Sequence, residues 1–504
     1  MNLLFIILIP MITTVRSDSS VSDNSDSSVA DSSDSSVSDN SDDVTMYNIF
    51  KWKYVDYIWE NEIQKQNAIN SGNYVPVSVV LYDVDKSQDG KTFVTAIRDK
   101  GVPASLMTVS DEMGPGGPLL NPYPDWSWYE DFDCKSNRII SVYRVDIKCN
   151  RLYVLDCGEV GETAVCPPKL LIFDLKDDRL IRKVTIPSHI ANNASGTGLL
   201  VTPFVHVHDC RRIRNANVFM ADINGFGIAI YNENSGKFCR IESTYMKPTN
   251  PNFNIAGQSF YLNDGPIGLA MINEKLFYSV LAGNKMYKME NIYDQQCPEL
   301  SESMTDQLTQ LAGTLSGQTG PIASKKCAIF FSNIPKTSIL CQDTNKVFNS
   351  TNTEVIVQDS VKLQFLSGMK IRGGSLIGLS NRFQRFVTGT SNLNEINFRI
   401  LSMHTEEIET KTKCFASCNK HHHKHKHCPN KHNSHENHDS HEHYDSCEHY
   451  SSHEHHGSHE HDSHEHHGSH EHDSHEHHGS HEHDSHENHN KLDKNNKFDS
   501  FILF

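Results

Sequence analysis

The sequence predicts an all-β protein, a six-bladed β-propeller flanked by a disordered N-terminal Ser/Asp arm and a disordered C-terminal His-rich tail. Short runs with alternating apolar residues, such as RLYVLDCG and KLLIFDLKDDRLIRKVTI, indicate antiparallel strands, and helical patterns are few. The runs group into about six units at a spacing of roughly 40–60 residues, which is typical of propeller blades. The units lie near residues 77–110, 139–187, 200–245, 265–290, 320–358 and 363–400. Periodicity alone leaves one large β-sandwich, or two smaller ones, as the alternative.

The segment before the predicted propeller has two parts. Residues 1–17, MNLLFIILIPMITTVRS, form an apolar run shorter than the roughly 20 residues of a membrane span, so they predict a signal peptide. Residues 18–45 are rich in Ser and Asp and too poor in apolar residues to form a core. We therefore expect a secreted, extracellular protein with a disordered arm and no membrane span.

Residues 46–405 have an ordinary composition and make up the predicted propeller. We expect helices at residues 60–69 and 304–312. The segment GPGGP at residues 114–118 predicts a turn and not a phosphate-binding loop, because its prolines remove backbone donors and no helical pattern follows. The sequence has neither a G-x-S-x-G elbow nor an H-E-x-x-H helix.

Charge and cysteine content restrict the partners and the compartment. The formal net charge is -17 and basic residues are scattered, which argues against a nucleic-acid partner. Most of the 13 cysteines should form disulfides in a secreted chain, and an odd number leaves at least one thiol free or bonded to another chain. Sequons at Asn193 and Asn349 predict glycosylation.

Residues 406–504 form the predicted tail, in which the segment SHEHHGSHEHD starts at Ser452, Ser463 and Ser474. Imidazole is the commonest protein ligand for Zn, Cu and Ni, and the repeats bring several imidazoles within reach of one ion. A solvated linker whose charge follows pH is the alternative, and it is compatible with metal binding. The predicted ligands for divalent metal ions are His453, His455, His456, His459, His461, His464, His466 and His467. Cys414, Cys418, Cys428 and Cys447 would add thiolates or pair as disulfides.

The segment HVHDC at residues 206–210 places His206 and His208 on one face of a predicted strand, beside Cys210. Two histidines at this spacing are a candidate metal pair. No third ligand follows nearby in the sequence. We therefore favour the simpler interpretation, in which these are strand histidines beside a disulfide cysteine.

A series of motifs resembles the insect yellow / major royal jelly protein family. The longest is NPYPDWSWYEDFDCKSNRIISVYRVDIKCNRLYVLDCG at residues 121–158, followed in the family's order by CPPKLLIFDL, FVHVHDC, LNDGPIGLAM, LSNRFQ and EINFRI. The resemblance spans residues 47–400 and implies a six-bladed propeller. Cys157 stands where the family usually has a small polar residue, so the local cysteine pairing cannot be transferred. The arm and the tail are not part of the family's common core.

The resemblance also implies a ligand cavity in the propeller channel that needs no cofactor. Some members bind biogenic amines there, and others are implicated in pigmentation, including dopachrome conversion. For an aromatic amine or catechol-type ligand, LSNRF offers Asn381 as a hydrogen-bond partner and Phe383 as an aromatic wall, both pointing the same way if the segment is extended. The alternative is that Asn381 satisfies a turn and Phe383 packs between blades.

The leading hypothesis is a secreted binding protein that holds a small aromatic amine or related ligand and carries a metal-binding tail. A melanin-pathway enzyme that converts dopachrome is the second hypothesis. A structural or nutritive secreted protein is the third.

Overall fold

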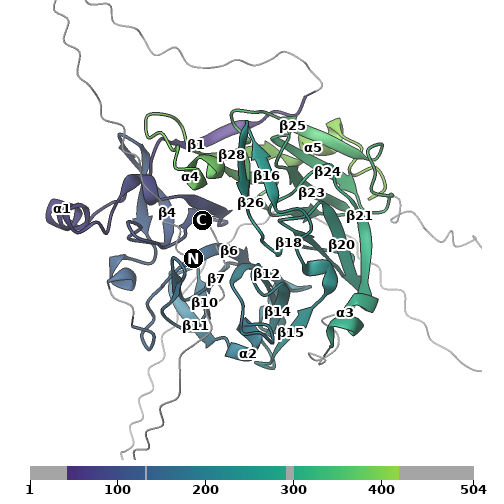
Figure 1. Ribbon diagram of the computed structural model, residues 1–504, viewed down its shortest axis with the longest axis horizontal. Coiled ribbons are helices and arrows are strands. Elements are labelled where there is room, and N and C mark those ends of the chain that lie inside the picture. Colours follow the sequence, from purple (N-terminus) through teal and green to yellow (C-terminus); the bar gives the residue numbers. More distant parts are fainter. Residues whose placement is uncertain (1–42, 131–132, 291–299, 419–504) are drawn as a thin grey trace, which may run out of the picture.

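The computed structural model describes residues 43–130, 133–290 and 300–418 (Figure 1). The expected signal peptide (residues 1–17), nearly all of the Ser/Asp arm and the repeats of the His-rich tail lie outside the described residues. So do Cys297, Cys428, Cys447 and all the tail histidines predicted as metal ligands.

Six four-stranded antiparallel sheets are found within the described residues, and the predicted six-bladed propeller is confirmed. The first blade is β2 to β5 (Leu81–Lys86, Thr92–Ala96, Leu106–Gly114, Gly117–Pro122). The second is β6, β7, β10 and β11 (Val142–Lys148, Arg151–Asp156, Lys169–Asp174, Arg179–Thr185). The third is β12 to β15 (Leu200–His206, Asn217–Asp222, Gly227–Asn232, Phe238–Glu242).

The remaining blades complete the ring. The fourth is β18 to β21 (Pro266–Ile272, Lys275–Val280, Lys285–Glu290, Thr309–Thr314). The fifth is β22 to β25 (Ala323–Lys325, Ala328–Asn333, Ser338–Asp343, Thr353–Gln358). The sixth is β26, β27, β28 and β1 (Phe365–Arg372, Ser375–Asn381, Phe398–His404, Tyr47–Trp52). Figure 1 shows β6, β12, β18 and β26 near the centre of the ring, with β11, β15, β21 and β25 at its rim.

Short elements decorate the blades. Two hairpins stand apart from the blades, β8–β9 (Glu159–Val160, Thr163–Ala164) and β16–β17 (Asn252–Ile255, Gln258–Tyr261). The α-helices are α1 (Glu62–Ser71), α2 (Ser188–Ala191), α3 (Glu302–Leu308), α4 (Phe383–Val387) and α5 (Thr405–Lys411). The 3-10 helices are η1 (Pro76–Ser78), η2 (Trp126–Tyr129), η3 (Cys210–Asn215) and η4 (Thr244–Met246). In the described part of the chain, no helix has the length and hydropathy needed to cross a membrane.

Most predicted elements are found within a few residues of their expected positions. The helix expected at 60–69 is α1, whose Asn61 side chain accepts a hydrogen bond from the N–H of Gln64. The turn expected in GPGGP joins β4 to β5. The second half of the helix expected at 304–312 is wrong, because the chain turns at Thr309 into β21 and pairs with β20. This edge pairing overrides local helix propensity. The expected first, fourth and sixth units each lack their outermost strand, which is β5, β21 and β1 respectively.

The core lies between neighbouring blades and not inside any one sheet. Along β13, Val218 and Met220 pack in the cluster shared with the second blade, whereas Phe219 and Ala221 pack in the cluster shared with the fourth. All four side chains are fully buried. A strand covered on both faces reads as a nearly continuous apolar run, which explains why alternation is weak in the central strands.

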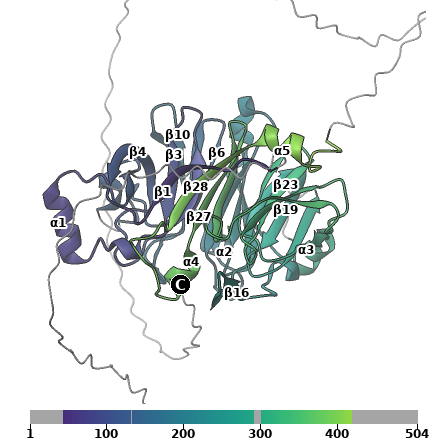
Figure 2. The same ribbon diagram turned by 90° about the horizontal axis from the view of Figure 1, so that it is seen from above.

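The ring closes through its two ends. Strand β1 pairs antiparallel with β28, from Tyr47 opposite Ser402 to Trp52 opposite Phe398, so the first strand of the chain completes the last blade. Figure 2 shows α5 on one face of the ring, with α4 and β16 on the other.

The folded body extends beyond the expected boundaries at residues 46 and 405. Val44 is buried before β1, and Ile408 and Phe415 are buried after β28 in the cluster between the fifth and sixth blades. Disulfides fasten this C-terminal extension to the fifth blade, Cys414 to Cys341 and Cys418 to Cys327. Burial of Ile408 in α5 and of Phe415 beyond it explains why these residues belong to the body and not to the tail.

Further disulfides tie the second blade to its surroundings. Cys134 pairs with Cys166, and Cys149 pairs with Cys210, which links the β6–β7 turn to the third blade. Cys157 is buried and forms no disulfide with another cysteine of the described residues, and burial raises the pKa of its thiol. A protonated, buried thiol is unreactive, so this cysteine is a packing residue. Disulfides throughout the described residues are consistent with an oxidising compartment.

Carboxylates on the inner strands bond neighbouring blades together. Asp85 accepts a hydrogen bond from the N–H of Ile147 (2.9 Å), and Asp146 accepts one from the N–H of Val205 (2.7 Å). Arg372 on β26 donates to both carboxylates, at 2.7 Å to Asp85 and 2.7 Å to Asp146. Although burial alone would lower it, these two negative charges raise the pKa of Arg372. One guanidinium therefore joins the sixth, first and second blades.

Replacing Arg372 with methionine should destabilise the protein strongly, because Arg372→Met leaves Asp85 and Asp146 buried without a cation. Removing one partner of a buried ion pair costs about 3–5 kcal/mol of the free energy of unfolding. Denaturant titration of the full chain measures this loss. The matched control is Arg179→Met, because Arg179 pairs with Asp177 on the surface, where an ion pair contributes about 0–1 kcal/mol. Equal losses in the two variants would contradict this role for Arg372.

Candidate functional site

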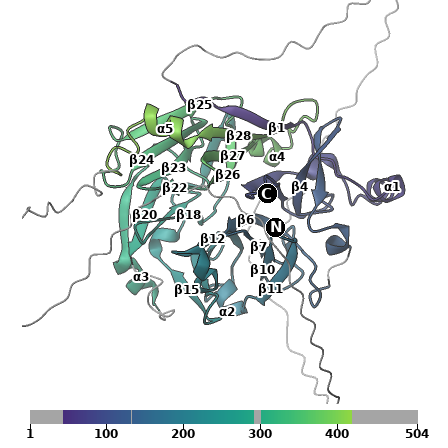
Figure 3. The same ribbon diagram turned by 180° about the vertical axis from the view of Figure 1, so that it is seen from behind.

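Two cavities lie at opposite ends of the central channel. The first, which we call the aromatic cavity, has a volume of about 330 Å³ and is lined by residues at the N-terminal ends of inner strands, including Tyr82, Tyr143 and Phe365. The second, which we call the basic cavity, has a volume of about 490 Å³ and is lined by residues at the C-terminal ends, including Lys148 and Arg372. Figure 3 shows the ring from behind, with β6, β12, β18, β22 and β26 surrounding the channel.

Irregular pairing at the start of the inner strands shapes the aromatic cavity. The register between the inner strand and the next strand shifts near the start of β2, β6, β12, β18 and β26. Such bulges bend a strand and re-aim its side chains, and they are common at barrel rims and beside active sites. This end of the channel can therefore hold a ligand without disturbing the regular pairing below it.

Aromatic side chains form one wall of the aromatic cavity. The ring of Phe383 lies 5.9 Å from Tyr82, 5.0 Å from Phe365 and 5.7 Å from Phe260, measured between centroids. Tyr82 in turn lies 6.0 Å from Tyr143 in an edge-to-face arrangement. Contacts of this kind add to the area burial of each ring and hold the wall rigid before any ligand arrives.

Of the two residues that the sequence predicted for ligand contact, Phe383 lines the aromatic cavity and Asn381 does not. Asn381 is buried at the end of β27, where its amide donates to the Leu81 carbonyl (2.9 Å) and to Ser367 (3.1 Å). Its side-chain oxygen accepts from the N–H of Phe383 (3.0 Å). The condition for a common direction, an extended segment, is not met, because β27 ends at Asn381 and α4 begins at Phe383. Asn381 therefore positions Phe383 from behind the wall.

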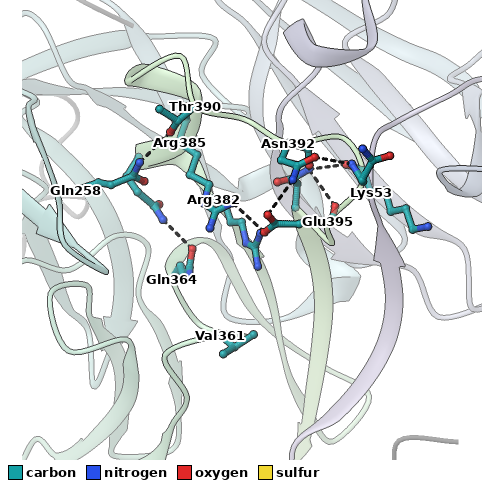
Figure 4. A network of polar contacts seen from close by, with 12 residues as sticks. Lys53, Gln258, Val361, Gln364, Arg382, Arg385, Thr390, Asn392 and Glu395 are labelled. Atoms are coloured by element: carbon teal, nitrogen blue, oxygen red, sulfur yellow. Dashed lines mark hydrogen bonds and ion pairs between the residues drawn. The ribbon is translucent and has the colours of Figure 1, made fainter. Parts of the chain in front are cut away.

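An ion-pair network anchors the segment around α4 (Figure 4). Arg382 and Arg385 both pair with Glu395, the latter at 2.8 Å, and Asn392 donates to the same carboxylate at 2.9 Å. Gln258, on the β16–β17 hairpin, donates to Thr390 at 2.8 Å. The hairpin and the α4 segment are thus fastened to each other over the same end of the channel.

Carboxyl groups face the aromatic wall. Asp264, in the loop before β18, lines the aromatic cavity, and burial raises its pKa to about 7, against the opposing charge of Arg144. Glu159, on the β8–β9 hairpin, also lines the aromatic cavity, and burial, helped by the charge of Asp222, raises its pKa to about 7. Arg144 is buried and donates to the Ser367 carbonyl at 2.7 Å. The site thus offers negative charge next to aromatic rings.

Sequence reasoning missed these carboxyl groups as site residues. Asp264 lies within the quoted segment LNDGPIGLAM, but nothing in the local pattern separates a cavity carboxylate from a turn aspartate. The three sides of the site come from chain positions near residues 82, 264 and 383. Only closure of the ring brings them together.

The basic cavity contains both histidines of HVHDC. His206 ends β12, His208 follows it, and the carboxylate of Glu274 lies beside both imidazoles. Cys210 forms a disulfide, which confirms that the histidines lie beside a disulfide cysteine. The third potential ligand, the carboxylate of Glu274, was not predicted from the sequence and comes from the β18–β19 turn of the next blade.

The two sequons lie in different surroundings. Asn349 is exposed in the loop between β24 and β25. Asn193 is half-buried, and its side-chain oxygen accepts hydrogen bonds from the N–H groups of Ser195 (3.0 Å) and Thr197 (3.0 Å). Thr197 lines the aromatic cavity, so a glycan on Asn193 would stand near the rim of this cavity. Glycosylation of both residues stays a prediction.

Comparison with known proteins gives a consistent result. A family model described as major royal jelly protein matches residues 140–414. Major royal jelly protein 9 of Apis mellifera is 36% identical over 389 residues, which cover 72% of this chain and 89% of the relative. Major royal jelly protein 2 of Apis mellifera is 35% identical over 391 residues, which cover 73% of this chain and 84% of the relative.

Among solved structures, virginiamycin B lyase from Staphylococcus aureus is similar with a TM-score of 0.34 and 13% identity. The match covers 65% of this chain and 95% of the lyase. No activity is transferred at this level of similarity.

Replacing Asn381 with alanine should lower stability, because Asn381→Ala leaves the buried Leu81 carbonyl and the Phe383 N–H without their partner. Unsatisfied buried polar groups cost about 1–3 kcal/mol of the free energy of unfolding. Denaturant titration measures this change. The exposed Asn394→Ala serves as the control, with an expected change within about 0.5 kcal/mol. Unchanged stability in Asn381→Ala, together with lost ligand binding, would instead show that Asn381 contacts the ligand directly, as the sequence suggested.

Proposed function

The chain belongs to the major royal jelly protein family, and we propose that it is a secreted protein that holds a small aromatic amine in the aromatic cavity. One observation carries the proposal: the carboxyl group of Asp264 and a set of aromatic rings in mutual contact line the same cavity of about 330 Å³. Small-molecule sites span roughly 300–1,000 Å³, so this volume suits a ligand of one or two rings.

The chemistry of the wall fits an ammonium group attached to an aromatic ring. The rings of Tyr82, Tyr143 and Phe383 offer stacking surfaces for the ligand ring and electron-rich faces for its cation. The Asp264 carboxylate supplies the opposite charge, and its burial strengthens the attraction because little water screens it. Arg144 is a competing cation, but Glu159 and Glu162 line the same cavity, so the carboxyl groups outnumber it.

Proton transfer is the second candidate function, and a specific observation favours it. Asp264 and Glu159 each have a pKa of about 7 and line the same cavity. Groups that titrate near neutral pH are suited to general acid–base catalysis. Tautomerisation of a dopachrome-type substrate removes a proton at one atom and adds one at another, so it needs no oxidant and no cofactor.

We further propose that the His-rich tail binds Zn, Cu or Ni through residues such as His453, His455 and His456. The repeated spacing of imidazoles supports this proposal. The disulfides of the body support a secretory route, since such bonds persist in oxidising compartments.

Amine binding should depend on the charge of Asp264. Asp264→Asn keeps the shape of the side chain but removes the charge, and a charge-assisted contact contributes about 1.5–3 kcal/mol. We expect the affinity for serotonin and dopamine, measured by calorimetric titration of the full chain, to fall about 10- to 100-fold. Glu162→Gln removes an exposed carboxylate at the same cavity and should change affinity less than about fivefold.

The pH dependence has a definite sign. Because the pKa of Asp264 is raised to about 7, its carboxyl group becomes neutral as the pH falls below that value. Only the ionised form attracts an ammonium, so the affinity should fall as the pH falls, by at most about tenfold per pH unit for one proton. In Asp264→Asn this dependence should flatten, leaving the contribution of Glu159.

The recovered ligand separates the two functions. Saturable heat with chemically unchanged amine supports a carrier. Product formation from dopachrome that is lost in Asp264→Asn supports the tautomerase. The absence of both would contradict both functions and leave the structural or nutritive role.

Removing the tail should separate metal uptake from amine binding. A chain that ends at residue 420 keeps every described residue of the body. We expect it to bind serotonin with unchanged affinity and to lose most of the Zn or Cu taken up by the full chain, measured by elemental analysis after dialysis. Loss of both properties would contradict this division between body and tail.

A further inference from the structure

The basic cavity contains three metal-ligand side chains that no other proposed function uses. One ligand atom from each of His206, His208 and Glu274 lies within 4.8 Å of the others. Nδ1 of His208 lies 3.3 Å from one carboxylate oxygen of Glu274, and Nε2 of His206 lies 3.6 Å from the other. The two imidazole rings lie 4.9 Å apart, nearly perpendicular to each other.

The backbone places these side chains from two blades. His206 and His208 lie two residues apart at the end of β12, which puts them on the same side of the chain. Glu274 lies in the two-residue turn between β18 and β19, in which Ile272 pairs with Lys275. Asn273 and Glu274 both have positive φ, 48° and 61°.

The conformation of Glu274 is unusual for its residue type. In such a turn the second central position is normally glycine, because a left-handed backbone costs other residues roughly 1–2 kcal/mol. Glu274 has this unfavourable backbone conformation, and its carboxylate is the one that lies beside the two imidazoles. Backbone strain of this kind clusters at functional sites.

We propose that His206, His208 and Glu274 form a binding site for a divalent transition metal of the zinc class. Two imidazole nitrogens and one carboxylate are a donor set that zinc and copper prefer, whereas magnesium and calcium prefer oxygen ligands alone. A tetrahedral ion with bonds of about 2.0–2.1 Å holds its ligand atoms about 3.3–3.4 Å apart. The observed distances of 3.3 and 3.6 Å are close to this spacing.

The fourth coordination position would face the basic cavity. Its volume of about 490 Å³ leaves room for water or an anion on the metal. Of the cations in this cavity, Arg372 is paired with Asp85 and Asp146, and Lys326 is paired with Glu409 at 2.8 Å. Lys148 also lines the cavity and adds positive charge, which favours an anion as the fourth ligand.

This site differs in kind from the His-rich tail, because the fold holds its three ligands in place. It also lies at the opposite end of the channel from the aromatic cavity, so it does not depend on amine binding. The competing explanation is an ion pair in which a protonated imidazole contacts Glu274 and no metal binds.

Chemical footprinting of histidines in the full chain separates these explanations. Diethylpyrocarbonate modifies free imidazole nitrogens, and mass spectrometry of peptides reports each histidine separately from the tail. His208 is suitable because its side chain is 66% exposed. Exposed His189, outside the site, is the internal control. A chelator buffer fixes the free Zn²⁺ concentration, so uptake by the tail does not deplete the metal.

We expect saturating Zn²⁺ to slow the modification of His208 at least about tenfold, with no change at His189 and no protection by Mg²⁺. Loss of a residue that only hydrogen-bonds to a metal ligand lowers metal affinity by about 10–100-fold. Glu274→Gln removes a ligand and should therefore raise the free Zn²⁺ needed for half-protection at least tenfold. Glu290→Gln, a surface carboxylate paired with Lys275, is the matched control and should not change it.

Two results would overturn the proposal. Modification of His208 at the same rate with and without Zn²⁺ would show that the three side chains form only an ion pair. Equal protection in the wild type and in Glu274→Gln would show that any bound zinc does not use this carboxylate.

Discussion

Closure of the ring is the constraint on which the other features depend. Strand β1, at residues 47–52, pairs in its blade only with β28, some 350 residues later in the chain, from Tyr47 opposite Ser402 to Trp52 opposite Phe398. Closure buries the faces that the two end blades of an open row would expose, and side chains of the first and sixth blades pack in one core cluster. It also creates the channel, because both cavities are lined by inner strands of several blades. The disulfides from Cys414 and Cys418 hold the chain beyond β28 against the fifth blade.

Polar side chains at the centre of the ring have a structural and a chemical role. Asp85 and Asp146 are buried on the inner strands, where a charge without a partner is costly. Asp85 and Asp146 therefore bond the backbone of the next blade and share Arg372. The two ends of the channel differ in the groups that they bring together. Carboxyl groups meet aromatic rings at one end, whereas imidazoles and lysines meet a carboxylate at the other.

Only one of the two residues predicted to contact a ligand, Phe383, lines the cavity, because Asn381 is used for packing. The sequence placed both in one ligand site, and the fold uses one to position the other. Both donor hydrogens and one lone pair of the Asn381 amide are already used, which leaves at most one acceptor position for a ligand. The carboxyl groups that do face the cavity, Asp264 and Glu159, lie in a loop and a short hairpin, where sequence patterns carry the least information.

The sequence by itself determined the class of fold, the number of blades and the family, because strand periodicity and ordered motifs are local properties of the chain. It also predicted the helix α1 and the turn in GPGGP, since both follow from local residue patterns. Only the tertiary structure decided which cysteines pair, that Thr309–Thr314 is a strand, and that Glu274 meets His206 and His208. Each of these three features depends on contacts between residues that are far apart in the chain. Local propensity does not indicate which distant residues the closed ring brings together.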